Sequence, residues 1–85
     1  MFDGNCQVIF AGTRLTGRTE VLLRPDGVTW DGTADNDRWF SSGPNVSREI
    51  LATALAAIAA NKVVYCNIET PNVDHAELSR FLIVR

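Results

Sequence analysis

The chain has few of the residues that catalysis or metal binding requires. Its 85 residues include two cysteines, Cys6 and Cys66, and a single histidine, His75. Two cysteines are too few for a disulfide framework or a zinc site, although they could form one bridge. The sequence offers no nucleophile–base pair, no set of metal ligands and no phosphate-binding loop. We therefore expect no enzyme activity, no cofactor and no bound metal.

Charge and hydropathy argue against two further classes of protein. The chain has ten acidic and eight basic residues, a net charge of −2, and its basic residues are spread out. Phosphate backbones are bound by clustered cations, so nucleic acid is a disfavoured ligand. No apolar run approaches the roughly 20 residues of a membrane span. The first residues, MFDGNCQ, lack the features of a secretory signal, which favours a cytoplasmic location unless the sequence is a mature secreted form.

What the chain does contain is a series of short strand-like segments interrupted by one helical pattern. The helix is expected over Ser47–Asn61, with Asn45 or Ser47 as N-cap and Asn61 as a left-handed C-cap. A bulge or bend is expected at Gly12, in a first strand that continues toward Leu15. Strands are expected over residues 6–11, 19–24, 38–40, 62–68 and 77–84, and a short strand arm is expected over 28–30.

This order, β-β-β-α-β-β, predicts a mainly β fold in a single domain over residues 1–85. It is the order of a five-stranded OB-fold Greek-key barrel with one helix between strands three and four. In such a barrel the first and fourth strands are neighbours, which would place Cys6 and Cys66 side by side, facing the interior. The expected core comprises Val8, Phe10, Val21, Leu23, Leu51, Leu55, Ile58, Val64 and Ile68.

The segment from residue 38 to 84 carries a recognisable succession of motifs. These are RWF at 38–40, a Ser/Gly/Pro loop, ILATALAAIAANKVVYCNI at 50–68, a short loop, and RFLIV at 80–84. The succession resembles the small OB-fold B subunits that form the receptor-binding rings of bacterial A–B toxins. The resemblance implies a ring of five subunits, a helix beside a central pore and edge-to-edge strand pairing. It also implies glycan binding on surface loops, although no glycan motif of the family is found here.

Two apolar features of the sequence independently favour self-assembly. The helix carries no charge between Glu49 and Lys62, whereas a helix face that meets water is usually charged. Residues 81–84 are apolar on both strand faces, so either a loop or another subunit covers the outer one. We expect a subunit, and the predicted interface comprises Trp39, Ala52, Ala56, Ala59, Phe81, Leu82 and Ile83.

The candidate ligand site is a group of aromatic and charged side chains on the middle strands. OB folds bind oligonucleotides and oligosaccharides on this surface. An alternative interpretation places Trp39 in the core or an interface and leaves only Trp30 partly exposed. Asp35 and Asp37 lie close by, and their spacing does not match a calcium-binding loop. The predicted ligand-binding residues are Arg24, Trp30, Asp31, Arg38 and Trp39.

Together these features predict a non-enzymatic module that forms a homo-oligomeric ring, with five subunits the favoured number. Its expected ligand is a small polar molecule such as a glycan, or a protein partner. One alternative is an OB fold that binds single-stranded nucleic acid through Trp30, Trp39 and the nearby arginines, which salt-dependent oligonucleotide binding would reveal. A second alternative is a small enzyme with an intersubunit site near His75 and Asp74.

Overall fold

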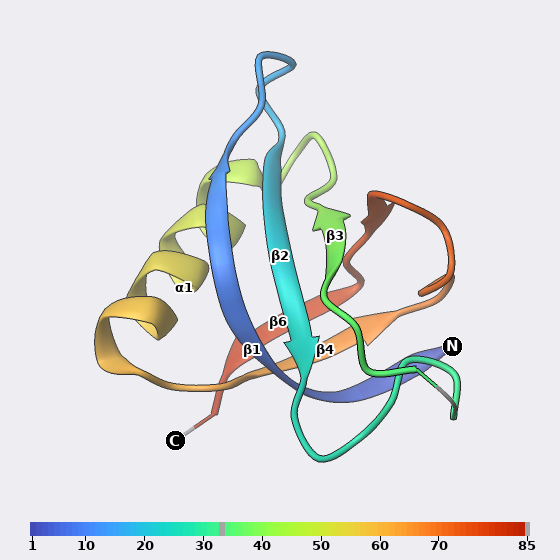
Figure 1. Ribbon diagram of the computed structural model, residues 1–85. Coiled ribbons are helices and arrows are strands. Elements are labelled where there is room, and N and C mark those ends of the chain that lie inside the picture. The colour runs from blue at the N-terminus through green and yellow to red at the C-terminus, as the bar shows by residue number, and fades with distance from the viewer. Residues whose placement is uncertain (33, 85) are drawn as a thin grey trace.

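The computed structural model describes residues 1–32 and 34–84, which form one curled sheet and one helix (Figure 1). The mainly β fold, with a single helix after the third strand, is confirmed. None of the described residues belongs to a helix long and apolar enough to cross a membrane. The elements are β1 (Phe2–Thr13), β2 (Thr19–Pro25), β3 (Arg38–Ser41), α1 (Ser47–Ala60), β4 (Val64–Ile68), β5 (Ala76–Glu77) and β6 (Arg80–Ile83).

The sheet curls because its two ends are joined by a short stretch of chain. The strand order is β5-β3-β2-β1-β4-β6, and only the β3–β5 pair is parallel. β5 and β6 are separated in sequence by Leu78 and Ser79 alone. The Leu78 N–H donates to the Ser41 carbonyl on β3 (3.0 Å), and the Ser79 N–H donates to the Asn67 carbonyl on β4 (2.8 Å). Opposite ends of the sheet therefore meet at one point, which gives the half-barrel seen in Figure 1.

Three differences from the predicted strands change the strand count or the position of the bend. Residues 28–30 form no strand, because the Trp30 N–H closes a turn onto the Ala34 carbonyl (2.7 Å). The expected strand over 77–84 is divided into β5 and β6, so the sheet has six strands where five were predicted. The irregularity in β1 lies between Val8 and Phe10, whereas Gly12 pairs regularly with Glu20. The predicted bend at Gly12 is therefore wrong by three residues.

That irregularity reverses the expected orientation of Phe10. Val8 and Phe10 are two positions apart on β1, whereas their partners on β2, Leu23 and Leu22, are adjacent. This mismatch is that of a β-bulge. Phe10 consequently aligns with Leu22 on the outer face and is 61% exposed. Its expected place in the core is wrong. The buried apolar residues are Phe2, Cys6, Val21, Leu23, Trp30, Phe40, Ala54, Ala57, Val64, Cys66, Ile68, Ala76 and Phe81.

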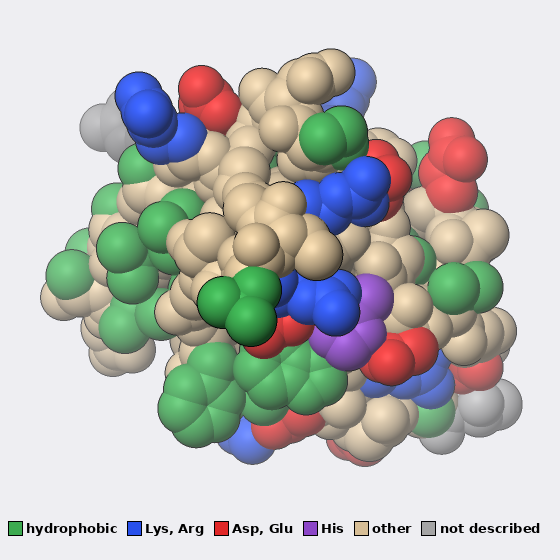
Figure 2. Space-filling view, turned by 90° about the horizontal axis from the view of Figure 1, so that it is seen from above, with side chains coloured by type: hydrophobic (Ala, Val, Ile, Leu, Met, Phe, Trp, Pro, Cys, Tyr) green, Lys and Arg blue, Asp and Glu red, His purple; other side chains and the backbone are tan. Residues whose placement is uncertain are grey.

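The helix packs on the sheet through small side chains rather than large ones. Its fully buried residues are Ala54 and Ala57, which allow α1 to lie close to the sheet. Leu55 and Ile58 are exposed as a result, and their expected burial is wrong. Figure 2 shows hydrophobic side chains at the surface on the left of the view, where α1 lies. Leu51 and Val8, also expected in the core, are half-buried.

The two helix ends are fixed in different ways. The N-cap is Val46, which makes no side-chain capping bond, so neither Asn45 nor Ser47 has that role. The Ser47 hydroxyl instead donates to the Gly17 carbonyl (2.8 Å) and so ties the helix to the β1–β2 turn. At the other end Asn61 has the predicted left-handed conformation (φ 53°).

The outward orientation of Phe10 can be tested by comparing the stability effects of alanine substitutions at Phe10 and at the buried Phe40. Phe40→Ala should lower the free energy of unfolding by about 3–5 kcal/mol, because it empties a fully buried site between Trp30 and β2. Phe10→Ala should change it by no more than about 1 kcal/mol. Urea unfolding at one protein concentration measures both. A larger loss from Phe10→Ala than from Phe40→Ala would contradict the described core.

Candidate functional site

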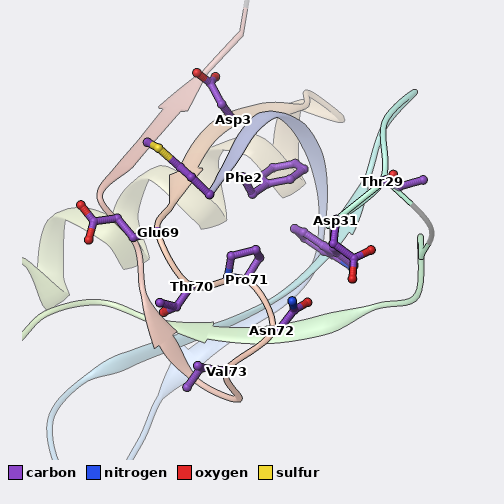
Figure 3. A pocket seen from close by; sticks show the side chains of 12 residues that line it. Phe2, Asp3, Thr29, Asp31, Glu69, Thr70, Pro71, Asn72 and Val73 are labelled. Atoms are coloured by element: carbon purple, nitrogen blue, oxygen red, sulfur yellow. The ribbon is translucent and has the colours of Figure 1, made fainter.

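The loop between β4 and β5 separates two hollows of the surface. The first, the end hollow, has a volume of about 660 Å³ and lies between this loop, the N-terminal residues and residues 29–32 (Figure 3). The second, the Trp39 cleft, has a volume of about 240 Å³ and lies between β3 and the loop. The loop residues Pro71, Asn72 and Val73 line both hollows. The Trp39 cleft is lined by Asn36, Asp37, Arg38, Trp39, Pro71, Asn72, Val73 and Asp74.

The predicted ligand-binding residues are divided between these two hollows. Trp30 and Asp31 line the end hollow, whereas Arg38 and Trp39 line the cleft. Arg24 lines neither; its Nε and Nη2 donate to the carboxylate of Asp37 at 2.8 and 3.1 Å. This bond raises the pKa of the Arg24 guanidinium above its ordinary value. The single platform expected from the sequence is therefore not assembled.

Trp30 belongs to the core, which removes it from any stacking platform. Its side chain is 2% exposed, between the rings of Phe2 (centroids 4.7 Å apart) and Phe40 (5.1 Å). The indole Nε1 donates to the Asn36 carbonyl at 2.5 Å. The guanidinium carbon of Arg38 lies 5.6 Å from the ring centroid. Its ring faces are thus already covered, and Trp39 is the more exposed tryptophan.

The acidic side chains of the end hollow do not converge. Figure 3 shows Asp3, Asp31 and Glu69 on separate sides of the opening. Asp3 accepts a hydrogen bond from the Tyr65 hydroxyl, which raises the pKa of that phenol. Within residues 1–32 and 34–84, no group of three or more His, Cys, Asp and Glu side chains is placed to hold a metal ion.

The Trp39 cleft combines an aromatic wall with a firmly held loop. The ring of His75 lies nearly parallel to that of Trp39, with an angle of 9° and centroids 6.2 Å apart. Two hydrogen bonds to the main chain of His75 accompany this stack. The His75 N–H donates to the Trp39 carbonyl (3.0 Å), and the Ser41 hydroxyl donates to the His75 carbonyl (2.9 Å). The loop thus ends against β3.

An apolar row extends from the cleft across the outer face of the sheet. Trp39 on β3 pairs with Leu22 on β2, which in turn pairs with Phe10 on β1. In Figure 2 the histidine side chain (purple) is adjacent to hydrophobic (green) and acidic (red) side chains. The row and the cleft form a surface on which a ring-shaped ligand could lie flat.

Acidic or amide groups already engage the arginines around this surface. Arg14 lies 3.6 Å from Glu20, and Arg18 lies 3.6 Å from Glu77. Arg24 is held by Asp37, as described above. Arg38 donates from Nη1 to the Pro71 carbonyl (2.9 Å) and to Asn72 Oδ1 (2.7 Å). The Arg38 guanidinium therefore fastens the loop through neutral acceptors, whereas Arg14, Arg18 and Arg24 each face a carboxylate.

The predicted interface residues separate into exposed and buried ones. Ala52, Ala56 and Ala59 are exposed on α1. On β6, Leu82 is 55% and Ile83 39% exposed, whereas Phe81 is 6% exposed. Phe81 packs in the core, because alternation along the strand turns it inward. The outward residues of this set thus lie on α1 and β6, which contact each other.

Sequence reasoning missed His75, Leu22 and the loop residues 71–74 as parts of one surface. His75 was interpreted as a loop residue, since nothing local indicates that it stacks on a residue 36 positions earlier. Its backbone is left-handed (φ 58°), a conformation that is uncommon outside glycine but that histidine adopts more often than most residues do. The Asp74–His75 pair directly before the last strands is the one local signal, and from the sequence it suggests only the alternative of an intersubunit catalytic site.

The two cysteines lie on neighbouring strands, as the predicted strand order requires. Cys6 on β1 is opposite Val64, and Cys66 on β4 is opposite Gly4. Both thiols are free and fully buried. A hydrogen bond from one thiol to the other, together with burial, raises the pKa of Cys66 well above its ordinary value. Neither is suited to act as a nucleophile.

This burial predicts slow thiol chemistry in the folded protein. Iodoacetamide at about pH 8 should modify neither Cys6 nor Cys66 on a timescale that fully alkylates the urea-unfolded chain. Intact-protein mass spectrometry over time measures both rates. Rapid modification of the native protein, at a rate similar to that of the unfolded chain, would contradict the described packing of β1 against β4.

Comparison with known proteins assigns the chain to no group. A scan against protein-family models finds no match, and searches of curated proteins and of solved structures find no significant similarity.

Proposed function

We propose that this protein is a non-enzymatic OB-fold module that binds a glycan in the Trp39 cleft and assembles into a homo-oligomeric ring, with five subunits the favoured number. The stacked Trp39–His75 pair, beside three arginines that each face a carboxylate, is the observation that carries the ligand assignment. The resemblance of residues 38–84 to toxin B subunits agrees with both parts of the proposal.

The strand pairing supports an OB fold. β1 pairs with both β2 and β4, and α1 lies between β3 and β4. β5 pairs in parallel with β3, and β6 continues from it along β4. If β5 and β6 are counted as one strand interrupted at Leu78 and Ser79, five strands remain in the order of that fold.

The chemistry of the cleft favours a neutral polyhydroxylated ligand. An aromatic face packs against the C–H groups of a sugar ring, and amides and carboxylates bind its hydroxyls. The cleft offers Trp39 for the first purpose and Asn36, Asn72 and Asp74 for the second. A nucleic-acid strand would instead meet the carboxylates of Asp37 and Asp74, which line the cleft. A glycan therefore fits this surface better than a polyanion does.

The surroundings of His75 support a role without catalysis. Its two ring nitrogens lie beside the carboxylates of Glu20 and Asp74, and not beside a hydroxyl or thiol. The thiols of Cys6 and Cys66 contact each other in the core, away from this loop. An intersubunit catalytic site at His75 and Asp74 would need a nucleophile from another chain.

Ligand binding can be tested with a panel of neutral oligosaccharides and with oligothymidine as a polyanion. At least one oligosaccharide should bind, and Trp39→Ala should weaken it by about tenfold, because the aromatic wall is removed. Leu15→Ala, an exposed residue of the β1–β2 turn, is the matched control and should have no effect. Calorimetry measures each affinity. Tighter, salt-dependent binding of oligothymidine would favour the nucleic-acid alternative instead.

Exposed apolar side chains and an open strand edge support the proposed assembly. Leu55 and Ile58 on α1, and Leu82 and Ile83 on β6, are exposed apolar side chains on two elements that contact each other. Among the described strands, β6 pairs with β4 alone, so its outer edge is free to accept a strand. Unpaired edges invite pairing with another chain, and a closed ring satisfies every such edge.

The assembly is tested by the native mass of a matched pair of leucine variants. Leu82→Lys should lower the native mass, because it places a charge in the proposed interface, whereas Leu15→Lys should leave it unchanged. Both leucines are exposed, so neither variant opens the core. Light scattering at micromolar concentration measures the mass. A folded 9.3 kDa monomer of the unmodified chain would exclude the ring.

A further inference from the structure

Both ring nitrogens of His75 contact carboxylate oxygens. Nδ1 lies 2.9 Å from Asp74 Oδ2, and Nε2 lies 3.2 Å from Glu20 Oε2. A neutral imidazole carries only one N–H, whereas the imidazolium carries two. In the neutral form one nitrogen would therefore present its lone pair to a carboxylate. The observed geometry satisfies both contacts only when the ring is protonated.

His75 is also the point at which the loop that walls the Trp39 cleft is attached to the sheet. The ring stacks on Trp39, the backbone bonds to Trp39 and Ser41, and φ is 58°. A left-handed backbone at a residue with a side chain persists only where its surroundings hold it. On the other side, Arg38 holds Pro71 and Asn72 through a guanidinium that keeps its charge at all ordinary pH values. One attachment of the loop can titrate, and the other cannot.

We infer that His75 is a pH-dependent latch for the Trp39 cleft. When protonated, it bridges Glu20 on β2 and Asp74 on the loop, and it holds Trp39 in the position described. Loss of the proton removes one of the two bonds and loosens the loop. Ligand affinity should therefore be higher on the acidic side of the range, about pH 5–8, in which histidines ordinarily change charge. The affinity part rests on the proposed function of the cleft.

The other charged groups near His75 are carboxylates and guanidinium groups. Glu20 is shared with Arg14 of the β1–β2 turn at 3.6 Å, and Asp74 lies on the same loop as His75. The pairs Arg18–Glu77 and Arg24–Asp37 lie beyond them on the same face. Carboxylates and guanidinium groups ordinarily keep their charge between about pH 5 and 8. A change in the cleft within this range is thus assigned to the imidazole.

An NMR titration of the unliganded protein between about pH 5 and 8 tests the latch without any ligand. The His75 ring protons, the Trp39 indole N–H and the Asn72 amide should share one midpoint. Loop amides should exchange several-fold faster above it. Glu20→Gln should move that midpoint to lower pH, because it removes one of the two carboxylates. Asp35→Asn, an exposed carboxylate with no contact to His75, is the control for charge alone. If the Trp39 or Asn72 signal does not change with pH at the His75 midpoint, the latch is refuted.

Affinity for a neutral oligosaccharide from the panel provides the second measurement. The dissociation constant should rise by about fivefold from pH 5.5 to 8, as expected when one charge-assisted hydrogen bond weakens. His75→Gln should abolish this dependence while retaining a side chain that can hydrogen-bond. Binding that is independent of pH in the unmodified protein would refute the latch even if the cleft binds sugar. A shared NMR transition without binding of any oligosaccharide would refute the proposed function and leave the latch standing.

Discussion

The architecture depends on two consecutive backbone hydrogen bonds at the link between β5 and β6. Leu78 bonds to β3 and Ser79 bonds to β4, although these strands lie on opposite sides of the sheet order. Backbone donors must be paired when they are removed from water, so these bonds fix where the chain can pass. The sheet is thereby curled on itself, and the loop before β5 is drawn across the end of the half-barrel.

That loop explains why the two hollows lie next to each other. It begins where β4 ends and returns to pair with β3, so its residues face the end hollow on one side and Trp39 on the other. Arg38 and His75 then fasten it at two points. The same strand, β3, supplies Trp39 to the cleft and Phe40 to the core, because neighbouring side chains on a strand point to opposite faces.

The thin core accounts for the apolar surface on the other side of the molecule. A chain of this length buries only about 60% of its unfolded surface, so a close approach of helix and sheet is favourable. Ala54 and Ala57 permit that approach. The larger Leu55 and Ile58 are then left exposed on α1, which contacts β6, the strand that carries the exposed Leu82 and Ile83. The close packing of α1 on the sheet thus leaves exposed the apolar side chains at which we propose that subunits meet.

The sequence alone was sufficient for the elements whose signals are local. The apolar run ending at Asn61 defined the helix, and alternation along β2 and β4 identified Val21, Leu23, Val64 and Ile68 as buried. Periodicity states which residues share a face but not which face turns inward. A single bulge between Val8 and Phe10 reversed Phe10, and the rotation of α1 buried alanines instead of leucines. The burial of Trp30 and the stacking of His75 on Trp39 could not be predicted for a related reason. Both placements depend on contacts between segments distant in sequence, which only the closed sheet brings together.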